Sequence, residues 1–273
     1  MTQKINLYQI AYDSKTLKQV QDSGFLLLDN QANERPDWYE YWPIRQFLLA
    51  ETLEEDAFYG FFSPKFYAKT GMDHAATLQQ VSQAAQVHAA DVVLFCPQPD
   101  MGASFLNVFE QAEVFDPGFL PVAQDFVKLK GVEIALGNLV MDTRQTIFSN
   151  YFVARPAFWR EWFVWSELLF ACAEDPSHPL HSGLTHNTNY AGNGQRKVFL
   201  QERLASLLLT LQPRFKTHAV NPFGFGWSMA KFRNAPDVVY INDALKRAFR
   251  DTGFPQYMHA FRYMREQIRN EPS

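Results

Sequence analysis

Short apolar segments alternate with helical patterns through the first half of this 273-residue chain. Residues 91–96 read Asp-Val-Val-Leu-Phe-Cys, a short apolar run that is typical of a buried strand. Three further segments share this strand character: 4–12, 24–28 and 57–66. Helical patterns over 14–21 and 73–90 lie between them. Strands that alternate with helices predict an α/β fold with a mostly parallel sheet.

The second half of the chain is predicted to be largely helical. Residues 157–173 carry aromatic side chains on nearly every face, which indicates a helix buried in a large core; membrane contact is the alternative. The other helical segments are 104–114, 117–129, 198–211 and 242–270, and an extended segment covers 146–154. We expect one domain, with residues 1–155 forming the sheet part and residues 156–273 a helical portion.

Composition excludes several classes of protein. The net charge is −4, from 25 basic and 29 acidic residues, so no overall positive field would hold nucleic acid. Cys96 and Cys172 lie in apolar runs, as expected for reduced thiols in the cytoplasm. We find no secretory signal and no window apolar enough to span a membrane, and therefore expect a cytoplasmic protein.

Polar side chains follow the predicted strands. The first strand ends at Tyr12 and Asp13; Asp29 and Asn30 come after the second, and Lys65 lies where the third stops. Open α/β sheets bind ligands outside the carboxyl ends of their strands. These residues are therefore candidates to hold a nucleotide, a divalent ion or a polyhydroxylated ligand.

Asp100 follows the strand at 91–96 and is the candidate ligand for a metal ion, Mg²⁺ or Mn²⁺. The segment Gln98-Pro99-Asp100 supplies a single carboxylate, so it would make a poor metal site on its own. Lys65 and Arg196 could instead neutralise a departing diphosphate without a metal ion.

Residues 195–204 begin an amphipathic helix directly after a loop, 186–194, that is rich in glycine and side-chain amides. A helix N-terminus attracts anions, so this junction is a candidate ligand site, with Arg196, Glu202 and Arg203 at the margin of a buried leucine stripe. The alternative is that the loop is a connector and that the charged residues form structural pairs.

Three carboxylates between the predicted helices, Glu110, Glu113 and Asp116, are candidates for a general base, because that role needs a carboxylate or a histidine. For Asp116, capping of the following helix is the simpler role. No phosphate-binding loop, dinucleotide fingerprint, zinc-protease motif or serine-hydrolase elbow is present. ATPases, dinucleotide enzymes, zincins and serine hydrolases therefore lose support.

Several segments, taken in order, resemble bacterial polysaccharide glycosyltransferases of the DUF4422 kind. The carriers are Phe58-Tyr59-Gly60-Phe61-Phe62-Ser63-Pro64-Lys65, the strand at 91–97, Ser149-Asn150-Tyr151 before the tryptophan helix, and Gln195-Arg196 through Glu202-Arg203-Leu204. The last is similar to a Gln-Arg-x-x-x-Phe-x-x-Glu-Arg-Leu element, and the likeness covers residues 38–211. The family's His-Tyr-Arg-Arg is here Phe62-Ser63-Pro64-Lys65, and an Asp-x-Asp motif is absent.

The resemblance implies a GT-A-like fold that binds a nucleotide-sugar across the ends of the first strands. It implies a donor site built from Tyr12, Asp13, Asp29, Asn30, Lys65, Arg196, Glu202 and Arg203. A sugar would pass to a hydroxyl of a surface glycan or lipid-linked acceptor, with peripheral contact with the inner membrane. The alternatives are a non-catalytic carbohydrate-binding or assembly protein with the same fold, and a sugar hydrolase with two carboxylates.

Overall fold

The computed structural model of the protein describes residues 3–189, 194–229 and 235–270. Six strands among these residues form one sheet in the order β2-β1-β3-β5-β4-β6. They are β1 (Ile5–Ala11), β2 (Leu26–Asp29), β3 (Phe58–Phe62), β4 (Val92–Leu94), β5 (Phe152–Ala154) and β6 (Thr217–Ala219). Only β5 runs antiparallel to its neighbours, β3 and β4. The predicted α/β class with a mostly parallel sheet is confirmed.

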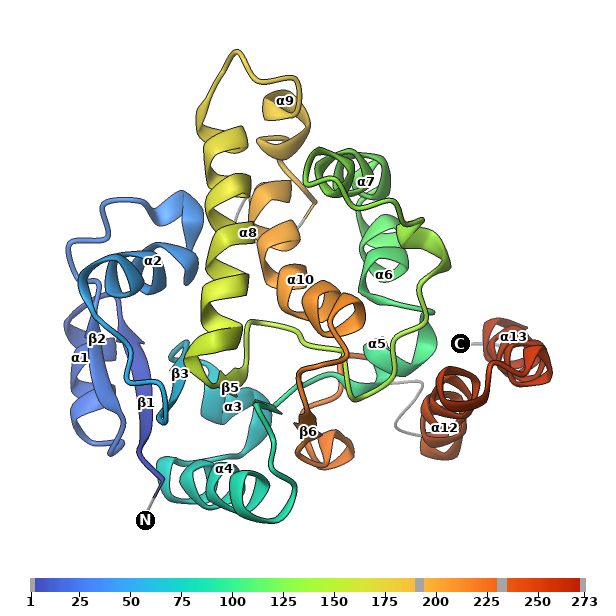
Figure 1. The fold of residues 1–273 in the computed structure, drawn as a ribbon, viewed down its shortest axis with the longest axis horizontal. Helices are drawn as coiled ribbons and strands as arrows, with labels where there is room; N and C mark the ends of the chain where they lie inside the picture. Colours follow the sequence, from blue (N-terminus) through green and yellow to red (C-terminus); the bar gives the residue numbers. More distant parts are fainter. Residues whose placement is uncertain (1–2, 190–193, 230–234, 271–273) are drawn as a thin grey trace.

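Helices cover the sheet and make up most of the C-terminal half (Figure 1). The helices before β5 are α1 (Ser14–Gln21), α2 (Tyr41–Ala50), α3 (Phe66–Thr70), α4 (His74–Val87), α5 (Pro99–Ser104), α6 (Val108–Phe115) and α7 (Phe119–Leu129). Those after it are α8 (Pro156–Glu174), α9 (His181–Leu184), α10 (Arg196–Leu211), α12 (Pro236–Thr252) and α13 (Pro255–Asn270). Short 3₁₀ turns lie at η1 (Pro36–Trp38), η2 (Leu136–Asn138) and η3 (Pro222–Gly224).

Two boundaries differ from the sequence-based expectation. The helix expected over 242–270 is two helices, because Gly253 adopts a left-handed φ of 73° that ends α12, and Pro255 then starts α13. Strand β6 lies in the part expected to be helical, yet it pairs with β4 in parallel. The sheet therefore draws on both halves of the chain.

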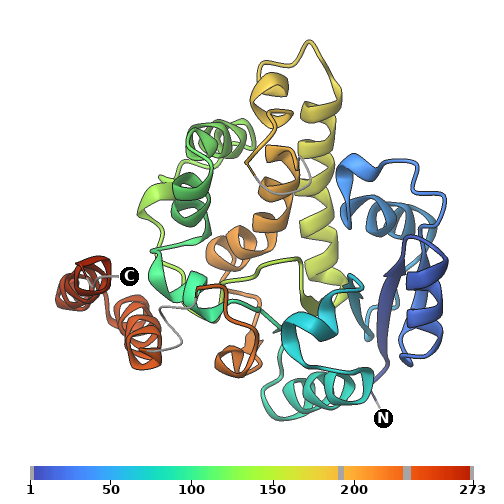
Figure 2. The same ribbon diagram turned by 180° about the vertical axis from the view of Figure 1, so that it is seen from behind.

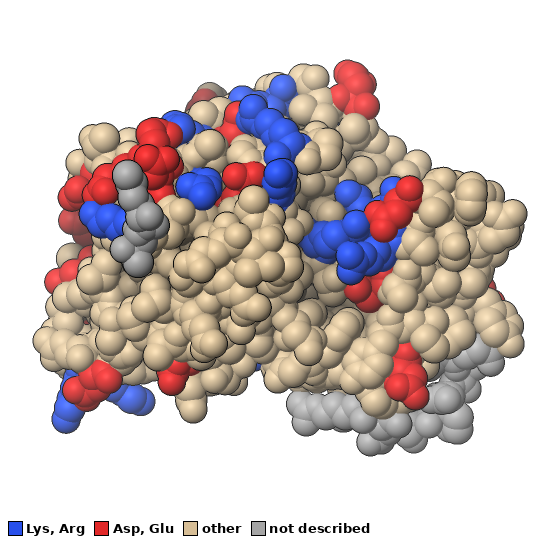
Figure 3. Space-filling model, turned by 60° about the horizontal axis from the view of Figure 1, so that its bottom comes forward, with Lys and Arg blue, Asp and Glu red and all other residues tan. Residues whose placement is uncertain are grey.

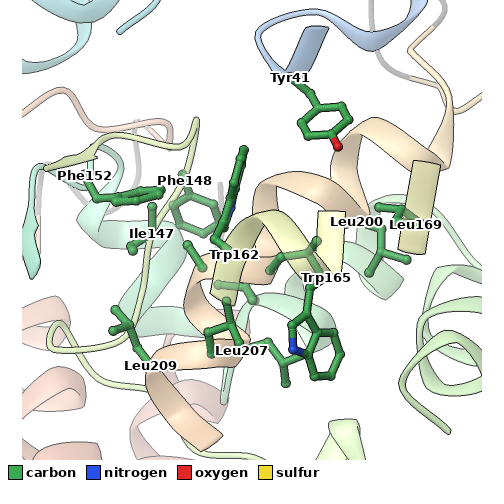
Figure 4. Close-up of a cluster of buried hydrophobic side chains, with 14 of the residues drawn as sticks. Tyr41, Ile147, Phe148, Phe152, Trp162, Trp165, Leu169, Leu200, Leu207 and Leu209 are labelled. Atoms are coloured by element: carbon green, nitrogen blue, oxygen red, sulfur yellow. The ribbon is translucent and has the colours of Figure 1, made fainter. Parts of the chain in front are cut away.

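Helices α8 and α10 form the centre of the core. Trp162 and Trp165 of α8 pack with Leu200 and Leu207 of α10 in a buried cluster that also takes in residues before β5 (Figure 4). Burial of a large side chain of this kind contributes roughly 1.5–3 kcal/mol. The leucine stripe expected to be buried on α10 is buried, and burial extends to most other residues of the helix as well.

Helices α12 and α13 stand at one end of the molecule, away from β1 and β2 (Figures 1 and 2). On the face seen in Figure 3, basic and acidic side chains lie close together, and a broad area is uncharged. Helix α4 contains no Lys, Arg, Asp or Glu. Within the described ranges no helix is both long and apolar enough to cross a membrane.

Candidate functional site

The carboxyl edge of the sheet has a topological switch point between β1 and β3. Strand β1 pairs in parallel with β2 on one side and with β3 on the other, so the connection from β1 to β2 and the connection from β3 to β4 leave this edge in opposite directions. Such a point opens a crevice outside the strand ends, where ligands of open α/β sheets bind. Tyr12 follows β1 and Ser63 follows β3. Tyr151 precedes the antiparallel β5, which brings it to the same edge.

Six side chains from five segments gather there and interact electrostatically. We call them the edge cluster: Tyr12, Glu40, Lys65, Lys69, Tyr151 and Glu202. Glu40 begins α2, the two lysines lie at the start of α3 and one turn further along it, and Glu202 lies on α10. The Glu40 carboxylate interacts with both lysines and with both tyrosines, and it repels Glu202. It is the central charge of the cluster.

Both carboxylates of the cluster are half-buried and hold their protons more tightly than usual. Burial, together with the charge of Glu40, raises the pKa of Glu202 to about 7, although Arg203 and Lys69 oppose the shift. Burial likewise raises the pKa of Glu40. In the described ranges neither carboxylate has a basic nitrogen within 4.0 Å. A group with a pKa near 7 can accept and return a proton at neutral pH.

Lysines and hydroxyls line the rest of the edge cluster. The Lys69 ammonium donates to the Ser149 hydroxyl over 2.7 Å and lies 5.5 Å from the centre of the Tyr151 ring. The hydroxyls of Ser63 and Tyr151 are 2.6 Å apart. Lys65 is exposed at the start of α3. The cluster therefore combines two cations, two carboxylates and hydroxyl groups at one edge of the sheet.

Three of the predicted donor-site residues, Tyr12, Lys65 and Glu202, meet in the edge cluster. Sequence reasoning missed Glu40, Lys69 and Tyr151. Lys69 could have been found, because it lies four residues after Lys65 on the same helix face. Glu40 gave no signal, since its position depends on the turn between η1 and α2, where Tyr39 has a φ of 46°.

Asp13, Asp29 and Asn30 also lie at the carboxyl edge, and each has a local structural role. Asp13 caps α1 by accepting from the Thr16 backbone amide over 2.8 Å. Asp29 accepts from the Gln31 amide over 3.0 Å. The buried Asn30 donates to Asn33 over 3.4 Å. These residues lie at the same edge of the sheet as Tyr12.

Arg196 is not in the edge cluster. Its guanidinium binds the Asp116 carboxylate over 2.6 and 3.1 Å and the Pro117 carbonyl over 2.8 Å. This mostly buried pair ties the start of α10 to the turn between α6 and α7. The alternative of a structural pair therefore describes Arg196 and Asp116. Residues 190–193 of the preceding loop, where we expected an anion site, lie outside the described residues.

Arg203 is also structural, and it is buried rather than at the margin of the helix. Its guanidinium donates to the carbonyls of Val108 and Phe199, each over 2.8 Å, and to the side-chain oxygen of Gln111. It lies 5.2 Å from the ring centre of Phe119. Burial lowers its pKa to about 10. Arg203 joins α10 to α6 and faces away from solvent.

The three carboxylates proposed as bases hold helix ends. Glu113 accepts from the amides of Gly118 and Leu120 over 2.9 and 2.7 Å and so caps α7, the role that we had expected of Asp116. Glu110 accepts from the Leu106 amide and pairs with Arg265 over 3.0 Å. None of the three interacts with the edge cluster in the contacts that the structure describes.

Asp100 does not form a metal site. It is fully buried in α5, where its carboxylate accepts from the amides of Ser228 and Met229 over 3.1 and 2.7 Å. Among the described residues, no group of three or more His, Cys, Asp or Glu side chains is placed to hold a metal ion. At the edge cluster, the oxygen donors suited to Mg²⁺ or Mn²⁺ are the carboxylates of Glu40 and Glu202.

Comparison with known proteins adds no relative. No protein-family model, curated protein sequence or solved structure matches this chain.

Proposed function

We propose that this protein is a glycosyltransferase that moves a sugar from a nucleotide-sugar donor to a hydroxyl of a bacterial surface glycan. The observation that carries the proposal is the edge cluster. It sets Glu202, a half-buried carboxylate with a pKa near 7, in the field of Lys69 and of Glu40, which itself interacts with Lys65, at the switch point of a mostly parallel sheet. The proposal is also supported by residues 195–204, which resemble the DUF4422-type element. Glu202 corresponds to the glutamate of that element.

In the proposed reaction the acceptor oxygen attacks the anomeric carbon of the donor sugar. The bond from that carbon to the diphosphate breaks, and the acceptor proton passes to the Glu202 carboxylate if the reaction inverts the anomeric centre. The diphosphate leaves with increased negative charge. Lys65 and Lys69 would stabilise that charge in the transition state, where electrostatic contacts lower the barrier most.

The remaining residues of the crevice would bind the donor. Tyr12 would offer an aromatic face to the nucleobase of the donor. Asp13, Asp29 and Asn30 lie at the same edge of the sheet, where the hydroxyls of the ribose would reach them. Glu40 would keep the pKa of Glu202 high through charge repulsion. A Mg²⁺ or Mn²⁺ ion would find two carboxylate ligands here, but two lysines share the site, and we propose that they replace the metal ion at the diphosphate.

The acceptor side and the location in the cell belong to the same proposal. A glycan or lipid-linked acceptor would be reached from the cytoplasm, with peripheral contact with the inner membrane. The C-terminal helices support such contact modestly: Phe254 and Tyr263 are exposed at 59% and 61%, and the exposed Arg262 lies beside Tyr263.

A thermal-shift panel tests the proposal. The purified protein is heated with UDP-, GDP-, CMP- and dTDP-sugars, each with and without Mn²⁺. One nucleotide class should raise the melting temperature in a concentration-dependent way, because a ligand that binds only the native state stabilises it. No shift with any donor would refute the proposal. A shift without transfer or hydrolysis would instead indicate a non-catalytic binding protein.

A further inference from the structure

The segment before β5 contains two consecutive residues in the left-handed region. Ser149 has a φ of 60° and Asn150 a φ of 53°. Neither is glycine, and such conformations cost roughly 1–3 kcal/mol each unless the surroundings enforce them. Asn tolerates this region better than most residues, and Ser does so less well. Something in the fold therefore holds this segment in place.

Residues 149–151 each contact a different element that contributes to or borders the edge cluster. The Ser149 hydroxyl accepts from Lys69 of α3 over 2.7 Å. The Asn150 amide donates to the side-chain oxygen of Gln201, on α10, over 2.8 Å. The Tyr151 hydroxyl bonds to that of Ser63, after β3. The two left-handed residues thus lie in a segment whose three successive side chains contact three different parts of the fold.

The contact between Asn150 and Gln201 is buried and incomplete. The two residues are only 3% and 2% exposed. One hydrogen bond joins them, whereas Asn150 Oδ1 and Gln201 Nε2 are buried without a partner. Each unpaired buried polar atom costs roughly 1–3 kcal/mol. Stability alone does not explain a pair that combines this cost with a strained backbone.

We infer that Asn150 is a positioning residue for Glu202. Gln201 directly precedes Glu202 on α10, so the hydrogen bond from Asn150 fixes this part of α10 against the segment that also holds Lys69. The carboxylate of Glu202 is thereby kept within the field of Glu40, Lys69 and Tyr151. This inference extends the proposed function, since it assigns the residue that keeps the base in place.

Asn150→Gly is the sharpest test. Glycine adopts a positive φ without strain, so the backbone is retained while the amide is removed. The relief of backbone strain at residue 150 offsets the loss of the donor to the Gln201 oxygen, so we expect the melting temperature and the nucleotide affinity to stay close to those of the parent protein. Turnover should fall at least tenfold, and the pH profile of kcat/KM should move to lower pH, because Glu202 is no longer held where its proton is retained.

Two further variants separate positioning from general damage. Ala89→Gly relieves a left-handed residue, φ 47°, on the exposed connection before β4, and should leave turnover unchanged. Gln201→Ala should lower turnover as Asn150→Gly does, and the double variant should be no worse than either single variant, because both remove one contact. Fully additive losses, or a loss of turnover in step with a loss of melting temperature, would overturn the inference.

A readout without turnover keeps the inference separate from the proposed function. Glu202→Gln should raise the free energy of unfolding more at pH 8 than at pH 5. The difference between these two increases, called the gain here, reports how strongly the fold holds the Glu202 proton. In the Asn150→Gly background this gain should fall by at least half. If the parent transfers no sugar and this gain still halves, the proposed function fails and the positioning role stands. An unchanged gain would refute the positioning role.

Discussion

Replacing Glu202 by glutamine should stabilise the protein at high pH and leave its stability unchanged at low pH. The fold raises the pKa of Glu202 from its ordinary value of 4.5 to about 7, so the folded state disfavours the charged form. Below pH 4.5 the carboxyl group is protonated in both folded and unfolded states and imposes no cost. Above pH 7 it is charged in both states, and the cost of burying that charge is present in full.

The size of the effect follows from the shift. A rise of about 2.5 pKa units corresponds to about 3 kcal/mol at 1.36 kcal/mol per unit. This value is an upper estimate, because solvent screens a side chain that is only half-buried. Glu202→Gln keeps the shape and removes the charge. At pH 8 the variant should therefore be more stable by up to about 3 kcal/mol, or roughly 6 °C in melting temperature for a chain of this length.

Urea unfolding followed by tryptophan fluorescence between pH 4.5 and pH 8 measures this difference. The advantage of the variant should grow through the window from pH 4.5 to pH 7 and then level off. Glu133→Gln, which removes an exposed carboxylate, is the control and should show no such trend. Glu40→Gln should reduce the advantage, because the charge of Glu40 contributes to the shift. If the difference in unfolding free energy between Glu202→Gln and the parent is the same at pH 4.5 and at pH 8, the reasoning is wrong.

Three further predictions separate structural residues from the proposed site. Arg196→Met should lower the unfolding free energy by about 2–4 kcal/mol in urea titrations, because it leaves Asp116 mostly buried and unpaired, while nucleotide affinity stays unchanged; equal stability would contradict the structural role. Donor affinity measured by calorimetry should agree within twofold in EDTA and in Mn²⁺. A tenfold loss of affinity in EDTA would indicate that donor binding depends on a metal ion. In a transfer assay, Glu202→Gln should lower kcat at least 100-fold, whereas Glu110→Gln and Glu113→Gln should keep more than half of the parent kcat. A large loss of kcat in either control would indicate that the general base lies on α6 and not on α10.

The first five strands and most helices could be predicted from local patterns, whereas β6 could not. The apolar runs that became β1, β3 and β4 are short and end in polar residues, and these signals depend on neighbouring residues alone. It could also be predicted that Tyr12 and Lys65 lie at the same edge of the sheet, because the carboxyl ends of parallel strands share one edge.

The composition of the site could not be predicted in the same way. Glu40 and Glu202 are 162 positions apart in the sequence, and only the packing of α2 and α10 at the sheet edge brings their charges together. Arg203 follows Glu202 directly, yet it points into the contact with α6, because successive residues on a helix face different directions. The same helix pattern thus contains a site residue and a structural residue, which the sequence alone did not separate.

Calorimetric titration of the free nucleoside diphosphates UDP, GDP, CDP and dTDP into the parent, Lys69→Met and Lys128→Met tests the central claim most directly. Lys69 belongs to the edge cluster, and Lys128 is an exposed lysine on α7. We predict that the parent binds one of these nucleotides, that Lys69→Met binds it 10- to 100-fold more weakly because a charged contact contributes roughly 1.5–3 kcal/mol, and that Lys128→Met binds it as the parent does. Equal affinity in the parent and Lys69→Met, or no binding to any of them, would contradict the account.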